Sequence, residues 1–80
     1  MTKKEKEKCE KLMKMAIQKV YDSKESYADY EKLLKEGDRV SAECKLRLAD
    51  NELGCAEGIN QALAELGFAH KDMVKLSELL

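Results

Sequence analysis

The clearest pattern in the chain is a long segment, residues 38–67, whose apolar side chains fall on two sides of a helix. At about 100° per residue, a first stripe contains Ala42, Leu46, Ala49, Leu53, Ala56 and Leu63. A second stripe, centred about 140° away, contains Val40, Cys44, Leu48, Cys55, Ile59, Ala62 and Leu66, with Asn51 in line. A helix with two apolar faces needs packing partners on two sides.

The preceding segment, residues 3–36, predicts a helix with one apolar face. It contains neither Gly nor Pro, and Thr2 followed by Glu5 has the spacing of an N-terminal capping box. Its apolar residues recur at the a/d spacing of a heptad, and the central ones are Cys9, Met13, Ala16, Ile17, Val20, Tyr27 and Leu34. This face can cover only one of the two stripes of the later helix.

Gly37 and Asp38 predict a sharp boundary between these helices. Gly37 can take the left-handed conformation that ends a helix, and Asp38 is a good N-cap for the next one. The connection is too short for parallel neighbours, so helices 3–36 and 39–66 are expected to fold back as a long antiparallel hairpin.

The C-terminal residues predict a short third helix. Gly67 ends the second helix, and residues 70–79 carry a further apolar side. A helix of this length is marginal alone and needs docking. We therefore expect one all-α domain, residues 1–80, in which the short helix covers the end of the second stripe near Ile59 and Leu66.

The rest of the second stripe predicts contact with another chain, because soluble monomers seldom expose a large apolar patch. A two-fold dimer with a four-helix-bundle-like core would bury it, and a higher even-numbered homo-oligomer or a different partner protein are alternatives. The expected interface residues are Cys44, Leu48, Gly54, Cys55, Gly58, Ile59 and Ala62.

Two of these residues, Gly54 and Gly58, lie four positions apart inside the helix, where glycine costs about 1 kcal/mol relative to alanine. We expect them to allow the close approach of another helix. A bend in the helix and a recess for a ligand are the alternatives. Gly-x-x-x-Gly is diagnostic of pairing only in membrane helices, so it indicates no membrane here.

Composition narrows the class of protein. The chain is 39% charged, lacks Pro and has a net charge of −1, which favours long helices and argues against a strongly basic nucleic-acid binder. Three cysteines without a close pair predict buried, unpaired thiols in a reducing compartment. The charged N-terminus lacks a signal-peptide pattern, and no apolar run is long enough to span a membrane. These features predict a cytoplasmic protein.

The motifs of catalysis are missing from the sequence. His70 is the single histidine and is expected to be exposed at the start of the third helix. There is no phosphate-binding glycine loop, nucleophile elbow or metal-binding His-Glu motif. The Glu-x-x-His pattern of carboxylate-bridged metal sites is absent as well. We therefore expect no metal, no cofactor and no enzymatic activity.

The favoured hypothesis is a homo-oligomeric helical protein that acts by protein–protein interaction. Small helical proteins with reduced cysteines are common in bacteria and phages, which suggests an inhibitor or adaptor such as a counter-defence protein. The alternative is sequestration of a nucleotide-like anion at an oligomer interface by Tyr27, Tyr30, Arg39 and Arg47. A DNA-binding regulator ranks below both, on a superficial helix-turn-helix pattern in residues 61–76.

Overall fold

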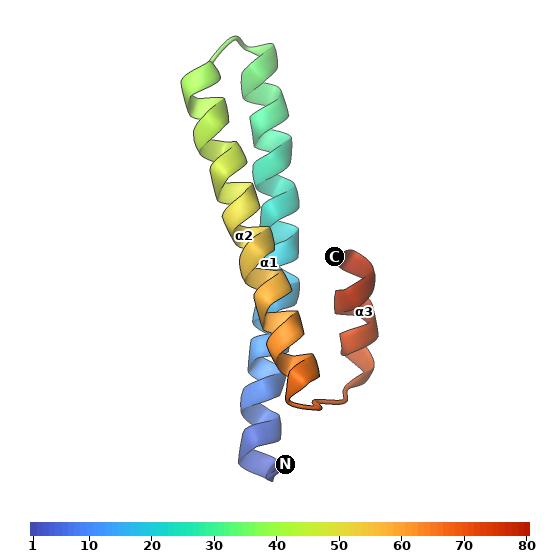
Figure 1. Ribbon diagram of the computed structural model, residues 1–80. Coiled ribbons are helices and arrows are strands. Elements are labelled where there is room, and N and C mark those ends of the chain that lie inside the picture. Colours follow the sequence, from blue (N-terminus) through green and yellow to red (C-terminus); the bar gives the residue numbers. More distant parts are fainter.

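The computed structural model describes all 80 residues and contains three helices and no strand. Helix α1 covers Lys3–Lys35, α2 covers Arg39–Glu65 and α3 covers Lys71–Leu79. The two long helices lie side by side as an antiparallel hairpin, and α3 lies along the half of the hairpin opposite its turn (Figure 1). The molecule is a rod of 52 × 17 × 16 Å. The predicted all-helical hairpin is confirmed, and each helix boundary lies within one residue of its expected position.

Local hydrogen bonds set where the long helices begin. The side chain of Thr2 accepts a 3.1 Å hydrogen bond from the backbone N–H of Glu5, at the start of α1. The carboxylate of Asp38 accepts a 3.1 Å bond from the backbone N–H of Ser41, at the start of α2. Both caps satisfy N–H groups that have no partner within the helix.

Both long helices end at a glycine with positive φ, at 83° for Gly37 and 74° for Gly67. Beyond the second glycine, the backbone N–H of Phe68 donates to the carbonyl of Leu63 at 3.0 Å. This six-residue bond is the mark of a Schellman motif, which needs a left-handed residue that glycine adopts without steric cost. The two glycines in the sequence therefore correctly predicted where α1 and α2 end.

The Asp38 cap predicts a dependence of stability on pH. Hydrogen bonds from Ser41 hold the pKa of the Asp38 carboxyl below its ordinary value of 3.8. A lowered pKa in the folded state stabilises the fold above the unfolded-state pKa, and this contribution is lost as pH falls through the folded-state pKa. We expect wild type to lose melting temperature relative to Asp38→Asn between about pH 5 and pH 2, because Asn caps without titrating. Parallel thermal melts of the two proteins across that range test this, and a constant difference between them would contradict it.

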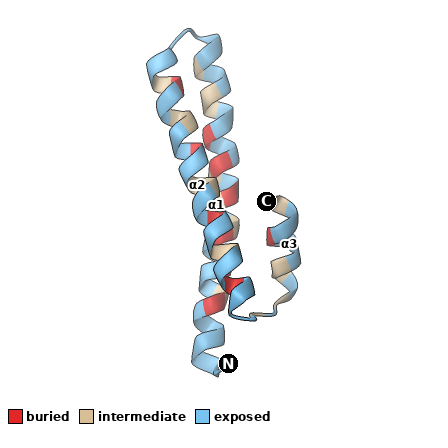
Figure 2. Ribbon diagram, in the orientation of Figure 1, coloured by how far each residue is buried: buried red, intermediate tan, exposed pale blue.

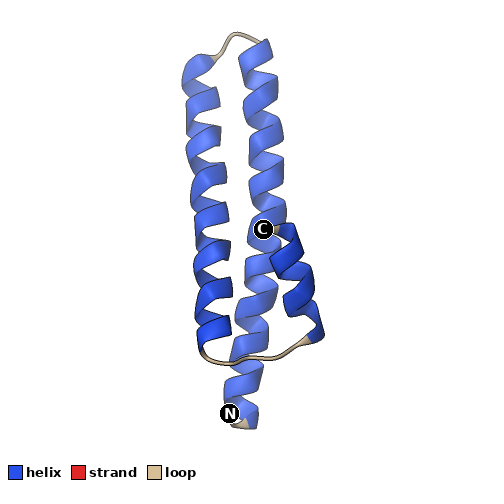
Figure 3. Cartoon of the chain, turned by 45° about the vertical axis from the view of Figure 1, so that its right-hand side comes forward, coloured by secondary structure: helices blue, strands red, loops and turns tan.

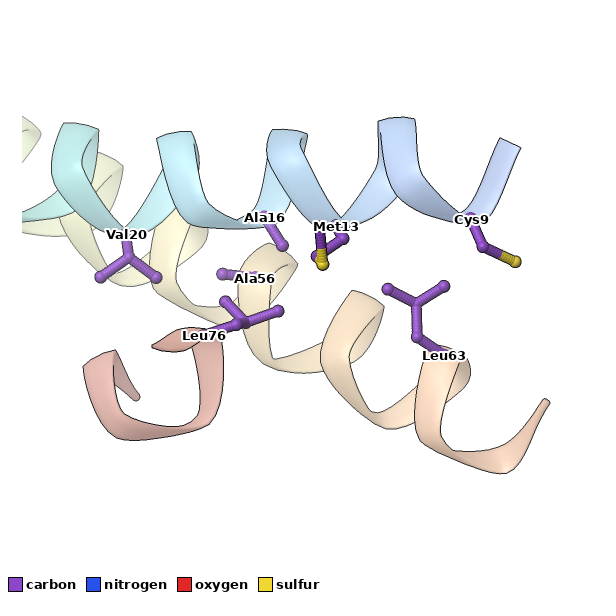
Figure 4. Packing of buried hydrophobic residues seen from close by; sticks show 7 residues of the cluster. All are labelled: Cys9, Met13, Ala16, Val20, Ala56, Leu63 and Leu76. Atoms are coloured by element: carbon purple, nitrogen blue, oxygen red, sulfur yellow. The ribbon is translucent and has the colours of Figure 1, made fainter. Parts of the chain in front are cut away.

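The core between the long helices is built from short side chains. On α2, Ala42, Ala49, Ala56 and Leu63 are buried at intervals of seven residues. The last two, Ala56 and Leu63, face a buried row on α1 that contains Cys9, Met13, Ala16 and Val20 (Figure 4), and the buried positions alternate with exposed ones along both helices (Figure 2). Three alanines in this seam let the helix axes approach closely. The first stripe of the second helix is thus confirmed as the surface that packs on the first helix.

Asn60 is a polar position in line with the first stripe of α2. It lies between Ala56 and Leu63 and is partly buried, and its Oδ1 atom has no hydrogen-bond partner in the protein. A buried amide oxygen without a partner costs about 1–3 kcal/mol. The seam is therefore less favourable at this turn than at the turns on either side.

In the half near the turn, the buried face of α1 differs from the heptad prediction. Tyr27 and Leu34 were expected in the core but are 48% and 43% exposed, whereas Ser23 and Ser26 are buried. The Ser23 hydroxyl donates to the carbonyl of Ala49 at 2.8 Å. The hydroxyl of Ser26 donates to Oε1 of Glu52 at the same distance. No third helix covers α1 here, so only the narrow strip facing α2 is buried (Figure 3).

The position of α3 also differs from the prediction. Leu76 is fully buried and packs beside Ala56 and Val20 in the seam between the long helices (Figure 4). The ammonium of Lys75 lies 5.9 Å from the ring centroid of Tyr21, which places α3 against α1. Leu66 remains 63% exposed, so the expectation that α3 would cover it is wrong.

The connection between α2 and α3 accounts for this placement. The rings of Phe68 and His70 stack, with centroids 5.9 Å apart. Nδ1 of His70 accepts a 3.0 Å hydrogen bond from the backbone N–H of Asp72 and so caps α3. Nε2 of His70 also lies 3.8 Å from Oε1 of Glu10 on α1. These contacts direct α3 toward α1 and away from the second stripe of α2.

Candidate interaction surface

The second stripe of α2 lies on the side of the molecule away from α3, and we call it the outer face. Its members are Val40, Cys44, Leu48, Asn51, Cys55, Ala62 and Leu66, and all of them are exposed. Val40 is 78% exposed and Leu48 is 45% exposed. In Figure 2 the left-hand side of α2 is correspondingly pale blue along most of its length. The fold leaves uncovered a larger part of this stripe than the sequence indicated, because α3 occupies the other side of the hairpin.

Ile59 differs from the other expected interface residues. It is partly buried and packs against the hydrophobic core cluster. It therefore forms the border between the core and the outer face. A substitution at Ile59 would disturb the fold and the face together, whereas Leu48 reports on the face with less effect on the core.

The two glycines of α2 are unused within the chain. A Cβ atom added at Gly54 or Gly58 would have no neighbouring heavy atom within 4 Å. Helix α2 nevertheless continues through both glycines without interruption, from Arg39 to Glu65. Neither the packing of α1 nor that of α3 therefore explains why these positions lack a side chain.

The apolar surface extends from α2 onto α1 at the end of the rod that carries the N-terminus. A groove of about 260 Å³ is lined by Met1, Glu5, Lys8, Cys9, Leu12 and Leu66. Met15 is exposed one helical turn beyond Leu12. Sequence reasoning missed Met15 because it lies outside the heptad stripe, although a large apolar residue at such a position is itself a signal.

The cysteines divide into two classes. All three are free, and Cys9 is buried as expected, but Cys44 and Cys55 are exposed. Within the single chain the prediction of buried thiols is therefore wrong for two of the three, and burial of these two by another chain stays a prediction. The reason is the same as for the outer face as a whole, since both residues lie on the side of α2 that no other helix covers.

The structure brings together only part of the predicted Tyr/Arg ligand cluster. The rings of Tyr27 and Tyr30 lie 5.6 Å apart between centroids. Tyr27 also lines a groove of about 390 Å³, together with Val20, Ser23, Lys24, Ala49, Asp50, Leu53, Leu79 and Leu80. Arg39 and Arg47 are not among the lining residues, and both cation–π contacts in the protein are made to Tyr21 by lysines. Anion binding by this cluster stays a prediction.

The structure contains no other cluster of reactive groups. No group of three or more His, Cys, Asp and Glu side chains is arranged to hold a metal ion. None of the three helices combines the length and the hydropathy that crossing a bilayer requires. His70, the single histidine, is engaged in capping α3.

No protein-family model matches this chain, and comparisons with curated proteins and with solved structures give no match. The outer face of α2 and the nearby Gly54 and Gly58 are features that the fold itself does not use.

Proposed function

We propose that the protein acts by binding another protein chain through the outer face of α2, as a homo-oligomer and without catalysis. The observation that carries the proposal is the alignment of the exposed apolar side chains. Single exposed apolar residues are ordinary on protein surfaces. Here, however, they follow one side of a helix from Val40 to Leu66, over about seven turns.

Covering this face would be favourable. Burial of apolar surface contributes about 25 cal/mol per Å², so 500 Å² on each chain would give roughly 12 kcal/mol per chain before the costs of association. In a two-fold dimer with the outer faces in contact, α1 and α2 of both copies would form a four-helix core. The α3 helices would lie on the far sides of that core.

An inhibitor or adaptor role fits a small protein of this kind, and a bacterial or phage counter-defence protein is one example. Such a protein needs a shaped surface rather than a reaction centre. Its activity would consist in occupying or joining target proteins. Dimerisation would present two copies of whatever target-binding surface each chain carries.

Replacing Leu48 with Asp is expected to reduce the particle from an oligomer to a single 9.1 kDa chain. The carboxylate would have to be buried without a partner at the centre of the outer face. Val74→Asp is the matched control, because Val74 is also an exposed apolar residue but lies on α3. Light scattering at micromolar concentration should show the wild-type mass for Val74→Asp and the single-chain mass for Leu48→Asp.

A wild-type particle of 9.1 kDa would contradict the homo-oligomer. The outer face would then have to meet a different protein. In a pull-down, Val74→Asp should still bind that partner, whereas Leu48→Asp should not. If the two variants behave alike in both experiments, the outer face is not the interaction surface. Circular dichroism of both variants would verify that the helices are intact.

A further inference from the structure

The outer face of α2 has a spacing that reads the same in both directions along the helix. From Val40 to the border residue Ile59, and leaving out Ala62 and Leu66 beyond it, the positions are separated by four, four, three, four and four residues, at Val40, Cys44, Leu48, Asn51, Cys55 and Ile59. The six positions therefore form three pairs that share one midpoint: Val40 with Ile59, Cys44 with Cys55, and Leu48 with Asn51. This midpoint falls between Ala49 and Asp50.

Such a spacing matches the symmetry of an antiparallel helix pair. When a two-fold axis relates two helices side by side, residues equally far from the axis on opposite sides lie at the same level along the helix pair. With the axis at the midpoint, Cys44, near the centre of the face, would lie opposite Cys55 of the second copy. Val40 would lie at the level of Ile59 of the second copy, and Leu48 at the level of Asn51, in each case on the other flank of the interface.

We propose that the partner of the outer face is a second copy of this chain, bound with α2 antiparallel to α2 about a two-fold axis between Ala49 and Asp50. The inference rests on the proposed function and specifies its partner, orientation and register. In this register, Cys44 of each copy faces Cys55 of the other at two symmetric positions.

The register gives Gly58 a packing role. Gly58 is eighteen residues from Val40, which is about five full turns, so both point to the same flank of α2. The two-fold axis keeps this flank of one helix beside the same flank of the other. Val40 of the second copy then lies about 1.5 Å along the axis from Gly58. The open space at the missing Cβ of Gly58 receives that side chain.

Charges on the opposite flank are complementary in the same register. Lys45 and Glu52 are seven residues apart and share the flank that faces α1, where Lys45 lies 3.7 Å from Asp29 and Glu52 accepts from Ser26. Lys45 of one copy comes within about 3 Å, along the axis, of the level of Glu52 of the other. The symmetry produces two such pairs, whereas a parallel arrangement would place the two lysines side by side.

The residues nearest the axis support one register over its neighbours. Leu48 of each copy lies beside Leu48 of the other on one side of the axis, and the two Asn51 residues approach each other on the other side. A polar Asn pair in an otherwise apolar helix interface fixes the register, because any slip leaves the amides buried against apolar groups. The Asn51 pair would thus select the arrangement that also aligns the cysteines.

The cysteines provide a direct readout of this geometry. Helix axes pack about 8–10 Å apart and Cα atoms lie about 2.3 Å from each axis, so facing residues have Cα atoms about 3.4–5.4 Å apart. The upper part of this interval overlaps the range of about 4.4–6.8 Å that a disulfide bond spans. Cys44 and Cys55 are exposed in the single chain, so they can react without unfolding it.

The test is disulfide crosslinking with diamide, followed by electrophoresis without reductant. Two thiols lose two hydrogens and join, and diamide takes up those hydrogens to become the hydrazine. Wild type is expected to give a covalent dimer of twice the 9.1 kDa chain mass. Cys44→Ala alone and Cys55→Ala alone should give none, since each variant places a thiol opposite a methyl group.

The two variants unfolded and refolded together should regain the crosslink. In a mixed pair, Cys55 of the Cys44→Ala chain faces Cys44 of the Cys55→Ala chain. Random pairing of equal amounts makes about half of all dimers mixed, so about half the wild-type yield is expected. The substitutions are at exposed positions, and the buried Cys9 is unchanged in every protein.

The opposing outcomes separate the two proposals. Crosslinking of either variant alone would indicate a parallel or shifted pairing and would overturn the register while leaving the dimer in place. A dimeric mass in light scattering with no crosslink in wild type would overturn the register as well. A wild-type particle of 9.1 kDa would overturn the pairing together with the homo-oligomeric form of the proposed function.

Discussion

Replacing Leu63 with Ala is expected to lower the free energy of unfolding by about 3–5 kcal/mol, as large-to-small substitutions in well-packed cores do. Leu63 is fully buried and projects from α2 between Met13 and Cys9 of α1 (Figure 4). Truncation would leave a cavity that the two long helices cannot close without tilting. Since single domains are stable by about 5–15 kcal/mol in total, this one change would remove much of the margin.

Urea unfolding followed by circular dichroism measures the effect. The matched control is Leu66→Ala, which removes the same atoms three residues further along α2 from a side chain that is 63% exposed. We expect Leu66→Ala to change the midpoint little at concentrations where the chain is monomeric. If the two variants are equally destabilised, the assignment of Leu63 to the core and Leu66 to the surface is incorrect.

Replacing Leu76 with Ala is expected to release α3 from the hairpin. Leu76 is the only buried residue of α3 and occupies the seam beside Ala56 and Val20. A nine-residue helix is not stable in isolation, so its structure depends on this docking. Loss of about 2–5 kcal/mol at the anchor should unfold α3 locally while the core of α1 and α2 stays protected.

Hydrogen exchange distinguishes local release from global unfolding. In Leu76→Ala, the amides of residues 71–79 should exchange at nearly the rate of an unfolded chain, with those near Val20 and Ala56 still slow. Val74→Ala, on the exposed side of α3, should retain the protection of wild type. Uniform acceleration in every helix would show that α3 is part of the cooperative core.

The same variant bears on the interaction surface. Because α3 packs against α1, away from the outer face of α2, its release should leave the particle mass unchanged. If the interface included α3, the particle mass would fall together with the hydrogen-exchange protection of α3. Leu76→Ala therefore tests independently where the partner lies.

Most of the fold could be predicted from the sequence because its determinants are local. The cap at Asp38 and the left-handed residue at Gly37 act within a few positions and need no distant partner. The alanines at seven-residue intervals indicated the buried side of α2 because helical periodicity is a property of the segment itself. The candidate interaction surface followed from the same periodicity, as the apolar stripe left over once the first one was assigned.

The failures concern long-range geometry. Tyr27 and Ser26 are one residue apart, and the heptad pattern selects Tyr27, yet α1 buries Ser26 because only α2 packs against it near the turn. The side chain of Leu66 was expected to be covered by α3, but it is 63% exposed because α3 packs on the other side of the hairpin. Hydrophobicity alone cannot decide on which side of the hairpin α3 docks, because both sides offer apolar side chains.

The sequence by itself determined three helices, their ends and the antiparallel pairing of the two longest, because capping, glycine conformation and amphipathic periodicity act over a few residues. Only the tertiary structure decided that α3 docks beside α1, through the buried Leu76, the stacked Phe68 and His70 rings and the contact of His70 with Glu10. These contacts join residues far apart in the chain, and their free energies depend on how surfaces fit in space. This docking leaves the end of the outer face near Leu66 exposed together with the rest of that face.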